Sequence, residues 1–365
     1  MKLLFVGTNR GGGGTESHFV TLARAMQAAG HTVVAVVYPG AAIHKGLVGS
    51  DVTLVDGVFR NAFDPRGIRR VWKTCRAVKP DWIIGSFSKE YWPLALISKI
   101  LGVKLALFKH MDFAMRPLTN YCIPRLADRF IVISRFMANR FIARGVKAEY
   151  ISVLYNPLNL DYYQPDPKLR ETTRNTLGYA KEDVVVGFIG AMHPDKGMLQ
   201  LADAVNQAMK ELPNLRALWI GEGRAVGELE SKLFGGGFSS RHTRYGWTSD
   251  VRPYYAAMDI LAMPSVESDT FGRVSIEAQA CGVPVVCSNI GGIPETLIPE
   301  ETGLLLPPGD ITALRDAIIK LTNDETLRLK MANRGREWVV QQFSAPVICQ
   351  EFKQLLESEQ VVRSN

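Results

Sequence analysis

The sequence is poor in the features that bind metals, form disulfide frameworks or cross membranes. Its 365 residues contain five cysteines, an odd number without a C-x-x-C pair, and no His or Cys cluster has metal-ligand spacing. Such cysteines are typical of reduced core thiols in a cytosolic protein. We therefore expect no metal and no cofactor.

Long hydrophobic runs are also missing. The apolar run within MKLLFVGTNRGGGG is too short for a signal peptide, and the most apolar later segment, Trp92 to Phe108, is interrupted by Lys99, Gly102 and Lys104. The sequence predicts that nothing spans a membrane and that the protein is cytoplasmic.

Neither of the better-known phosphate-binding motifs is present. A glycine-rich loop, Asn9 to Gly14, lies between a predicted strand, Lys2 to Gly7, and a predicted helix, Thr15 to Ala29. No Lys-Ser/Thr pair follows as in a P-loop, and the G-x-G-x-x-G register fails at Glu16. The loop suits phosphate, but a dinucleotide site is disfavoured.

Charge is unevenly distributed along the chain. Residues 1–157 hold 22 Lys and Arg against 9 Asp and Glu, whereas the other 208 residues hold 21 against 27. A basic first half indicates an anionic partner, such as a membrane surface or a phosphorylated glycan; the alternative is a solvated basic surface. The sequence shows no recognisable nucleic-acid module, so no nucleic-acid partner is expected.

Short apolar strands alternate with helices twice along the chain, once on each side of a predicted linker, Pro157 to Asp183. This alternation predicts an α/β protein with two doubly wound, Rossmann-like domains and a cleft between them. We expect residues 1–157, with a final helix in about 345–365, to form the N-terminal domain, and residues 158–344 to form the C-terminal domain.

The stretch from Pro264 to Pro284 joins a buried strand to a helix predicted to run from Phe271 to Cys281, with Asp269 or Thr270 as its cap. The start of such a helix presents N–H groups and suits phosphate. Asp269 precedes the first turn, and Glu277 lies roughly 10 Å further along at about 1.5 Å per residue. A helix start that binds phosphate, with a carboxylate on either side to accept hydrogen bonds from hydroxyl groups, would suit a nucleotide sugar. The alternative is an ordinary capped helix whose acidic side chains are solvated.

The same stretch resembles the E-x7-E signature of retaining family-four glycosyltransferases with the GT-B fold. Asp269 stands where that family usually has Glu, and Glu-Ala-x-Ala-Cys-Gly-x-Pro follows. The resemblance implies that this domain binds the donor, a nucleotide-diphosphate sugar. The donor-binding residues it implies in this stretch are Phe271, Gly272, Arg273, Val274 and Glu277.

The resemblance extends over nearly the whole chain. Gly190 to Gly197 is similar to the family's diphosphate-binding G-R-x-x-x-x-K-G, with Lys196 retained and Ala191 in the Arg position. Gly14 would let the backbone approach the donor diphosphate from the opposite domain. His110, in His-Met-Asp, matches the family's histidine near the reacting carbon, so the resemblance implies His110 and Asp269 as catalytic residues. The loops that frame the base would include Arg244, Tyr245 and Gly246.

The spacing of basic and apolar residues predicts a helix from Pro65 to Lys79 with one strongly basic face. This face could contact anionic lipid or a phosphorylated acceptor, and a solvated face is the alternative. Its residues are Arg66, Arg69, Arg70, Lys73 and Arg76.

These features predict a metal-independent, retaining glycosyltransferase that moves a sugar from a nucleotide-diphosphate sugar to an anionic or lipid-linked glycan acceptor. The N-terminal domain would bind the acceptor, in cell-envelope polysaccharide or lipopolysaccharide synthesis, with peripheral contact to the inner leaflet of the cytoplasmic membrane. Two alternatives stay open: a sugar-nucleotide epimerase or hydrolase, and a non-catalytic protein that binds sugar nucleotides or polyanions.

Overall fold

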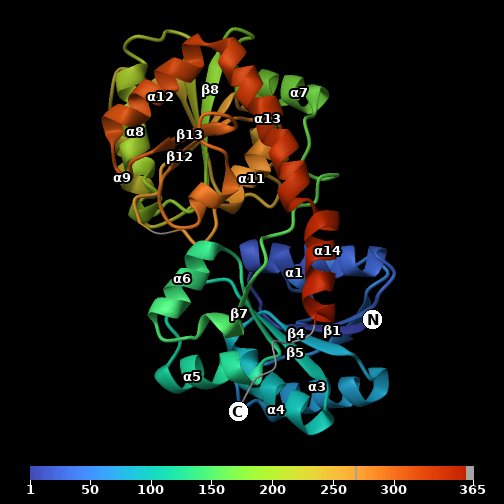
Figure 1. The fold of residues 1–365 in the computed structure, drawn as a ribbon. Helices are drawn as coiled ribbons and strands as arrows, with labels where there is room; N and C mark the ends of the chain where they lie inside the picture. Colours follow the sequence, from blue (N-terminus) through green and yellow to red (C-terminus); the bar gives the residue numbers. More distant parts are fainter. Residues whose placement is uncertain (268, 359–365) are drawn as a thin grey trace. The chain divides into compact units, whose positions relative to one another are not determined.

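The chain folds into two units, each built on an open parallel sheet (Figure 1). The computed structural model describes residues 1–267 and 269–358. Unit 1 comprises Met1–Leu158 and the C-terminal segment that begins at Phe343, and unit 2 comprises Asn159–Gln342. The expected α/β class with two doubly wound, parallel-sheet units is confirmed.

Unit 1 has strand order β3-β2-β1-β4-β5-β6-β7. Its central strands are short and almost wholly apolar, because helices cover both faces of the sheet. Helices α1 and α14 lie on one face, and α3 and α4 lie on the other (Figure 1). The elements of unit 1 are β1 Lys2–Gly7, α1 Gly14–Ala28, β2 Thr32–Val37, α2 Ala42–Leu47, β3 Thr53–Asp56, α3 Pro65–Val78, β4 Trp82–Gly85, η1 Ser88–Glu90, α4 Tyr91–Leu101, β5 Lys104–Lys109, α5 Pro117–Leu126, β6 Arg129–Val132, α6 Arg135–Ala143, η2 Ala148–Tyr150, β7 Ile151–Val153 and α14 Ala345–Glu357.

Unit 2 has strand order β10-β9-β8-β11-β12-β13. Helices α8, α9 and α12 pack on one face around Trp219, and α7, α10 and α11 pack on the other around Tyr255. The elements of unit 2 are α7 Pro167–Leu177, β8 Val184–Ile189, η3 Pro194–Lys196, α8 Met198–Ala208, β9 Leu215–Ile220, α9 Val226–Phe234, η4 Ser239–Arg241, β10 His242–Tyr245, α10 Arg252–Ala257, β11 Ile260–Met263, α11 Arg273–Ala280, β12 Val285–Ser288, η5 Ile293–Thr296, β13 Gly303–Leu306, α12 Ile311–Asn323 and α13 Glu325–Phe343.

Each sheet has one point where the strand order reverses direction. In unit 1 this switch point lies between β1 and β4, which pair in parallel, and in unit 2 it lies between β8 and β11. In open α/β sheets, ligands bind outside the carboxyl ends of the strands at such a point. The loops that follow these four strands are therefore where each unit is expected to bind a ligand.

The predicted linker from Pro157 to Asp183 is wrong in one respect, because it contains helix α7. Asp166 caps this helix by accepting a hydrogen bond from the N–H of Leu169, and Pro167 occupies its first turn. The helix is anchored by Arg174, whose guanidinium donates to Asp259 Oδ2 at 3.0 Å. No helix within the described residues is long and apolar enough to cross a bilayer.

Candidate functional site

Lys196 and Asp269 meet at the switch point of unit 2. Lys196 ends the short η3 turn after β8, and Asp269 lies in the loop after β11. The Lys196 ammonium donates to Asp269 Oδ2 at 2.7 Å, and their side chains are 30% and 15% exposed. The structure therefore brings together a cation and a carboxylate from two loops that are 73 residues apart in sequence.

The second oxygen of Asp269 is held by the backbone. Its Oδ1 accepts hydrogen bonds from the N–H groups of Phe271 at 3.3 Å and Gly272 at 3.1 Å. The carboxylate is thus fixed on both sides, so its orientation is set before any ligand arrives. Predicted as a helix cap, Asp269 instead closes a turn that precedes the helix.

Helix α11 begins at Arg273, two residues later than predicted, with Gly272 as its N-cap. Gly272 has φ 97°, in the left-handed region that favours glycine. Neither Asp269 nor Thr270 is the cap, because this left-handed residue separates their turn from the helix. The predicted donor residues Phe271 and Val274 flank the start of α11, Phe271 being buried and Val274 half-buried.

Two glycines let the loops around Asp269 approach one another closely. Gly197 has φ 71°, and a Cβ there would lie 1.8 Å from the carbonyl oxygen of Pro264. Gly291 has φ 64°, and a Cβ there would lie 2.2 Å from the carbonyl oxygen of Asp269. The loops after β8, β11 and β12 therefore meet backbone to backbone, and Gly292 adds a hydrogen bond to the Asp269 carbonyl at 2.8 Å.

Glu277 projects from α11 into a buried polar cluster. Its Oε1 accepts a hydrogen bond from Arg273 Nε at 2.7 Å, and its Oε2 accepts one from the hydroxyl of Tyr255 at 3.0 Å. Burial and then the Glu277 charge raise the pKa of both Tyr255 and Tyr163, so their hydroxyls stay protonated at neutral pH. Glu277 is 7% exposed, and each of its two carboxyl oxygens accepts a hydrogen bond from a neighbouring side chain.

The side chain of Arg273 pairs with Glu277, one helical turn further along α11. The sequence predicts Arg273 as a donor-binding residue, which could bind phosphate in place of the arginine missing at Ala191; the alternative interpretation is that its side chain points to solvent. In the structure its Nε is engaged by Glu277, and its Nη1 is buried without a hydrogen-bond partner among the described residues. Solvent exposure is therefore wrong, because the side chain is only 15% exposed. Ala191 itself is exposed in the loop after β8.

The residues predicted to frame a base lie at the edge of the same sheet. Arg244 and Tyr245 belong to strand β10 and not to a loop as predicted, and Gly246 follows the strand. Arg244 forms ion pairs with Glu222 and Glu230, each at 3.2 Å. These two pairs fix the guanidinium beside the loop after β9.

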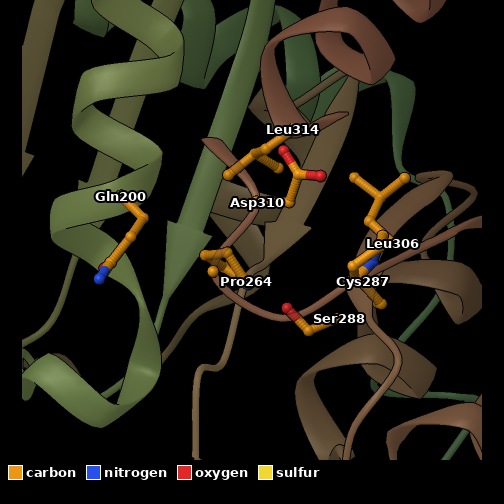
Figure 2. A pocket seen from close by; sticks show the side chains of 9 residues that line it. Gln200, Pro264, Cys287, Ser288, Leu306, Asp310 and Leu314 are labelled. Carbon is orange, nitrogen blue, oxygen red and sulfur yellow. The ribbon is translucent and has the colours of Figure 1, made fainter. Parts of the chain in front are cut away.

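A small cavity lies beside the Asp269 loop. Figure 2 shows its lining side chains, which come from α8, from the ends of β11, β12 and β13, and from the start of α12. It has room for about one water molecule, which is too little for a sugar or a phosphate. Its labelled residues include Gln200, Pro264, Ser288, Leu306 and Asp310. The residues around this cavity therefore pack against the loop that carries Pro264, and the cavity is not a candidate ligand site.

In unit 1, His110 directly follows β5 and is 6% exposed. Its ring packs edge-on against His18 of α1, with centroids 4.6 Å apart, and stacks on Phe108 at 5.8 Å. Asp112, two residues on, pairs with Arg140 at 3.1 Å and Arg144 at 2.8 Å. The structure thus brings His18 to His110, a contact without a local sequence signal.

Two further features of unit 1 concern the glycine loop and the basic helix. Gly14 opens α1 at the end of the exposed segment of residues 11–14. All five basic residues predicted on α3 are exposed, and the opposite side of the helix buries Val71, Thr74 and Cys75. Glu90, which no sequence motif marks, is a fully buried carboxyl group that accepts two hydrogen bonds from Thr8 beside the glycine loop.

Comparison with known families matches both halves of the chain. Residues 12–162 match the family described as Glycosyltransferase Family 4, and residues 183–324 match Glycosyl transferases group 1.

Two curated relatives are similar over most of their length. One is the capsular polysaccharide biosynthesis glycosyltransferase CapM of Staphylococcus aureus, 28% identical over 71% of this chain and 69% of CapM. The other is a GDP-mannose-dependent alpha-(1-6)-phosphatidylinositol monomannoside mannosyltransferase of Mycobacterium tuberculosis, 25% identical over 74% of this chain and 75% of that protein.

Solved structures share the fold over nearly the whole chain. Anabaena HepE in complex with UDP and glucose has a TM-score of 0.84 at 25% identity and covers 98% of this chain and 100% of its own. A glycosyltransferase from Rickettsia africae has a TM-score of 0.85 at 20% identity, covering 98% and 99%.

Proposed function

The chain belongs to the family-four glycosyltransferases with the GT-B fold, and from this we propose that it transfers a sugar from a nucleotide-diphosphate sugar, with retention of configuration, to a glycan or lipid-linked acceptor. The observation that carries the proposal is the Lys196–Asp269 pair at the switch point of unit 2. A diphosphate needs a cation, and a sugar needs hydrogen-bond acceptors for its hydroxyl groups. The pair supplies one of each.

The parts of the donor are assigned to separate groups in this proposal. Lys196 and the backbone at the start of α11 bind the diphosphate, and Asp269 accepts hydrogen bonds from the sugar. Glu277, with both oxygens oriented by Arg273 and Tyr255, accepts the ribose hydroxyls. Because these groups meet the diphosphate charge, we propose that the reaction needs no metal.

Retention follows from a front-face substitution. The bond between the anomeric carbon and the phosphate oxygen breaks, and the bond to the acceptor oxygen forms on the same face of the sugar. The acceptor hydroxyl gives its proton to the leaving phosphate oxygen, so no carboxylate has to become covalently attached. Lys196 stabilises the charge that grows on the leaving group, and His110 is the catalytic residue proposed for unit 1.

The names of the relatives guide the choice of substrates. HepE is solved with UDP and glucose, and the mycobacterial relative is named as GDP-mannose-dependent. These two proteins differ in base and sugar, so UDP- and GDP-sugars are the donors to test first. CapM is named for capsular polysaccharide synthesis, which supports an acceptor in cell-envelope polysaccharide or glycolipid synthesis, lipopolysaccharide included.

The basic face of α3 is proposed to contact an anionic acceptor or the anionic inner leaflet of the cytoplasmic membrane. Its five cationic side chains are exposed, and Leu96 and Ile100 are exposed on the neighbouring helix α4. Each basic residue near such a surface contributes about 1 kcal/mol. Binding to anionic vesicles should weaken as salt shortens the Debye length to about 8 Å at physiological strength. If the protein ignores anionic vesicles and phosphorylated glycans at low salt, the face is only solvated.

A panel of nucleotide sugars tests the function. The true donor should raise the unfolding temperature, since a ligand at about 100 times its Kd adds roughly 2.7 kcal/mol. Transfer to an envelope-type acceptor in EDTA, followed by assignment of the anomeric configuration by NMR, tests retention and metal independence. Release of free sugar or an epimer without transfer would identify a hydrolase or epimerase, and binding without turnover would identify a non-catalytic protein. If the panel contains no ligand, the proposal is wrong.

A further inference from the structure

Thr8 joins three segments of unit 1 at the entrance to the glycine loop. It directly follows β1 and is fully buried. Its N–H and hydroxyl donate to Glu90 Oε1 at 2.8 and 2.6 Å, and its hydroxyl also accepts from the N–H of Phe59 at 3.2 Å. Its carbonyl accepts from the Lys89 ammonium at 2.8 Å. Every polar group of Thr8 is engaged, so the point where the chain leaves β1 is fixed.

Glu90 is an unusual residue for such a position. It lies in the turn between β4 and α4, it is 0% exposed, and its Oε2 has no hydrogen-bond partner among the described residues. The ammonium next to it, on Lys89, is bound to the Thr8 carbonyl. A buried carboxyl with an unmatched oxygen costs free energy that an apolar side chain would not. Because Glu90 costs stability at this position, its role is to be found in the segment that it anchors through Thr8.

What Glu90 holds is one end of the glycine loop. Residues 11–14 are exposed glycines with no side chains of their own to fix them. At the other anchor, Asn9 donates to Glu16 Oε1 at 2.6 Å. The loop lies at the switch point of the unit 1 sheet, where a ligand is expected. Its placement thus depends on two short tethers, Thr8 to Glu90 and Asn9 to Glu16.

We propose that Glu90 is a positioning residue, which sets the glycine loop for substrate through Thr8 without touching substrate itself. The effect on turnover rests on the proposed glycosyltransferase function, whereas the effect on the loop does not. Glu90 is the part of the tether that can change its charge.

The charge of Glu90 makes the tether sensitive to pH. Burial raises the pKa of its carboxyl to about 7. The Lys89 ammonium in the same turn acts against this rise in pKa, and burial, together with Arg10, in turn lowers the pKa of Lys89. Burial and the Glu90 charge raise the pKa of Tyr91 at the start of α4, so its hydroxyl stays neutral. The carboxylate accepts hydrogen bonds from Thr8 more strongly than the neutral acid does. The Thr8–Glu90 hydrogen bonds should therefore hold the loop more tightly at pH 8 than at pH 6, although burial of the charge lowers the stability of unit 1 as a whole over the same range.

Hydrogen exchange measured by mass spectrometry on the full chain tests the tether. Glu90→Ala should speed exchange in residues 8–14 by about tenfold relative to wild type at the same pH, because the N–H and hydroxyl of Thr8 lose their acceptor. Thr8→Val, which keeps the shape of the side chain, should have a smaller effect of the same sign and serves if Glu90→Ala does not fold. Glu90→Gln keeps a hydrogen-bond acceptor and should keep most of the protection of residues 8–14. Its protection factors, which are corrected for the intrinsic exchange rate at each pH, should however no longer differ between pH 6 and pH 8. Glu149→Gln, an exposed carboxylate of unit 1, is the control.

Turnover and nucleotide binding give the second readout. Glu90→Ala should lower kcat by about tenfold and leave the thermal shift produced by UDP or GDP unchanged, with partial rescue of kcat in Glu90→Gln. Wild-type exchange rates in residues 8–14 of both Glu90→Ala and Thr8→Val would overturn the proposal, as would a pH dependence in Glu90→Gln equal to that of wild type. If no variant, wild type included, binds a nucleotide, the proposed function fails while the exchange data still decide the role of Glu90.

Discussion

Units 1 and 2 place a carboxyl group at the same point of the same kind of sheet, yet they surround it differently. In unit 2, Asp269 is partly exposed and faces the ammonium of Lys196 from the neighbouring loop. In unit 1, Glu90 is fully buried and accepts its hydrogen bonds from the neutral N–H and hydroxyl groups of Thr8. The difference teaches that topology fixes where a group lies, whereas exposure and partners decide whether it can meet a ligand or only support the chain around it.

The largest effect expected concerns the buried ion pair in unit 2. Arg273→Ala should destabilise unit 2 by about 3–5 kcal/mol, because it leaves the Glu277 carboxylate buried without its cation. Arg224→Ala, an exposed arginine of the same unit, should stay within about 0.5 kcal/mol. Denaturant unfolding of both variants measures the contrast.

The same variant decides between two roles for Arg273. Had Arg273 replaced the missing cation at Ala191, Arg273→Ala would lower turnover without loss of stability, and Ala191→Arg would restore it. We expect Ala191→Arg to leave the stability of Arg273→Ala unchanged, because the lost partner of Glu277 is not replaced.

Removing the cation at the unit 2 switch point comes next. Lys196→Ala should lower kcat by about a hundredfold, since the leaving diphosphate loses a charge that stabilises it in the transition state. Lys210→Ala, an exposed lysine of unit 2, provides the matched control. Equal activity in the two variants would assign the diphosphate to other groups.

The buried carboxyl of unit 1 should show itself in the pH dependence of stability. Burial raises the pKa of Glu90 from an ordinary value of 4.5 to about 7. Ionisation is thus harder in the folded state, so its contribution to stability is fully present below pH 4.5 and is lost as the pH rises through 7, by at most about 3 kcal/mol. Glu90→Gln should flatten this fall, measured from pH 5 to pH 8 by denaturant-dependent exchange of β1 and β4. An unchanged slope would mean that Glu90 titrates normally.

The smallest effect distinguishes the two members of the unit 2 pair. Asp269→Asn should strengthen UDP or GDP binding by about two- to fivefold, because the Lys196 ammonium no longer pairs with a competing carboxylate. Turnover should fall, because the carboxylate that accepts hydrogen bonds from the donor sugar is lost. Glu277→Gln should instead weaken binding of the free nucleotide. Asp203→Asn, which breaks the matched Lys232–Asp203 pair at 2.7 Å, should change neither quantity. Equal losses of nucleotide affinity in Asp269→Asn and Glu277→Gln would contradict the assignment of Asp269 to the sugar and Glu277 to the ribose.

Local patterns predicted much of this fold, because buried parallel strands read as short apolar runs wherever they occur. Strand β8 is such an apolar run, and helix α3 was predicted from the alternation of basic and apolar residues at helical spacing. Strand β10, whose sequence is HTRY, lies at a sheet edge and has no apolar run to reveal it. Helix α7 did carry a signal, Asp-Pro at its start and Gly178 at its end, but a composition rich in polar residues concealed it.

The residues proposed for the site could be named from the sequence, whereas their contacts could not. Asp269 and Glu277 were named from their positions around a predicted helix start, and Lys196 from the resemblance to the family's diphosphate-binding motif. Their partners depend on which loops the sheet brings together. The Lys196–Asp269 contact spans 73 residues, and the Thr8–Glu90 contact spans 82. Arg273 lay within reach of inference, since a residue four positions before Glu277 on a helix is its neighbour. Glu90 gave no such signal, because its burial follows only from the order of the strands.

The close approach at Gly197 and Gly291 bears on how this protein could acquire new substrates. Carbonyl oxygens, and not side chains, set the spacing between the loops that carry Lys196 and Asp269. Exposed neighbours such as Ala191 can therefore be exchanged while the two charges keep their separation. Sugar or base preference can then diversify by surface substitution around a constant frame, whereas an alanine at either glycine would disturb every substrate alike.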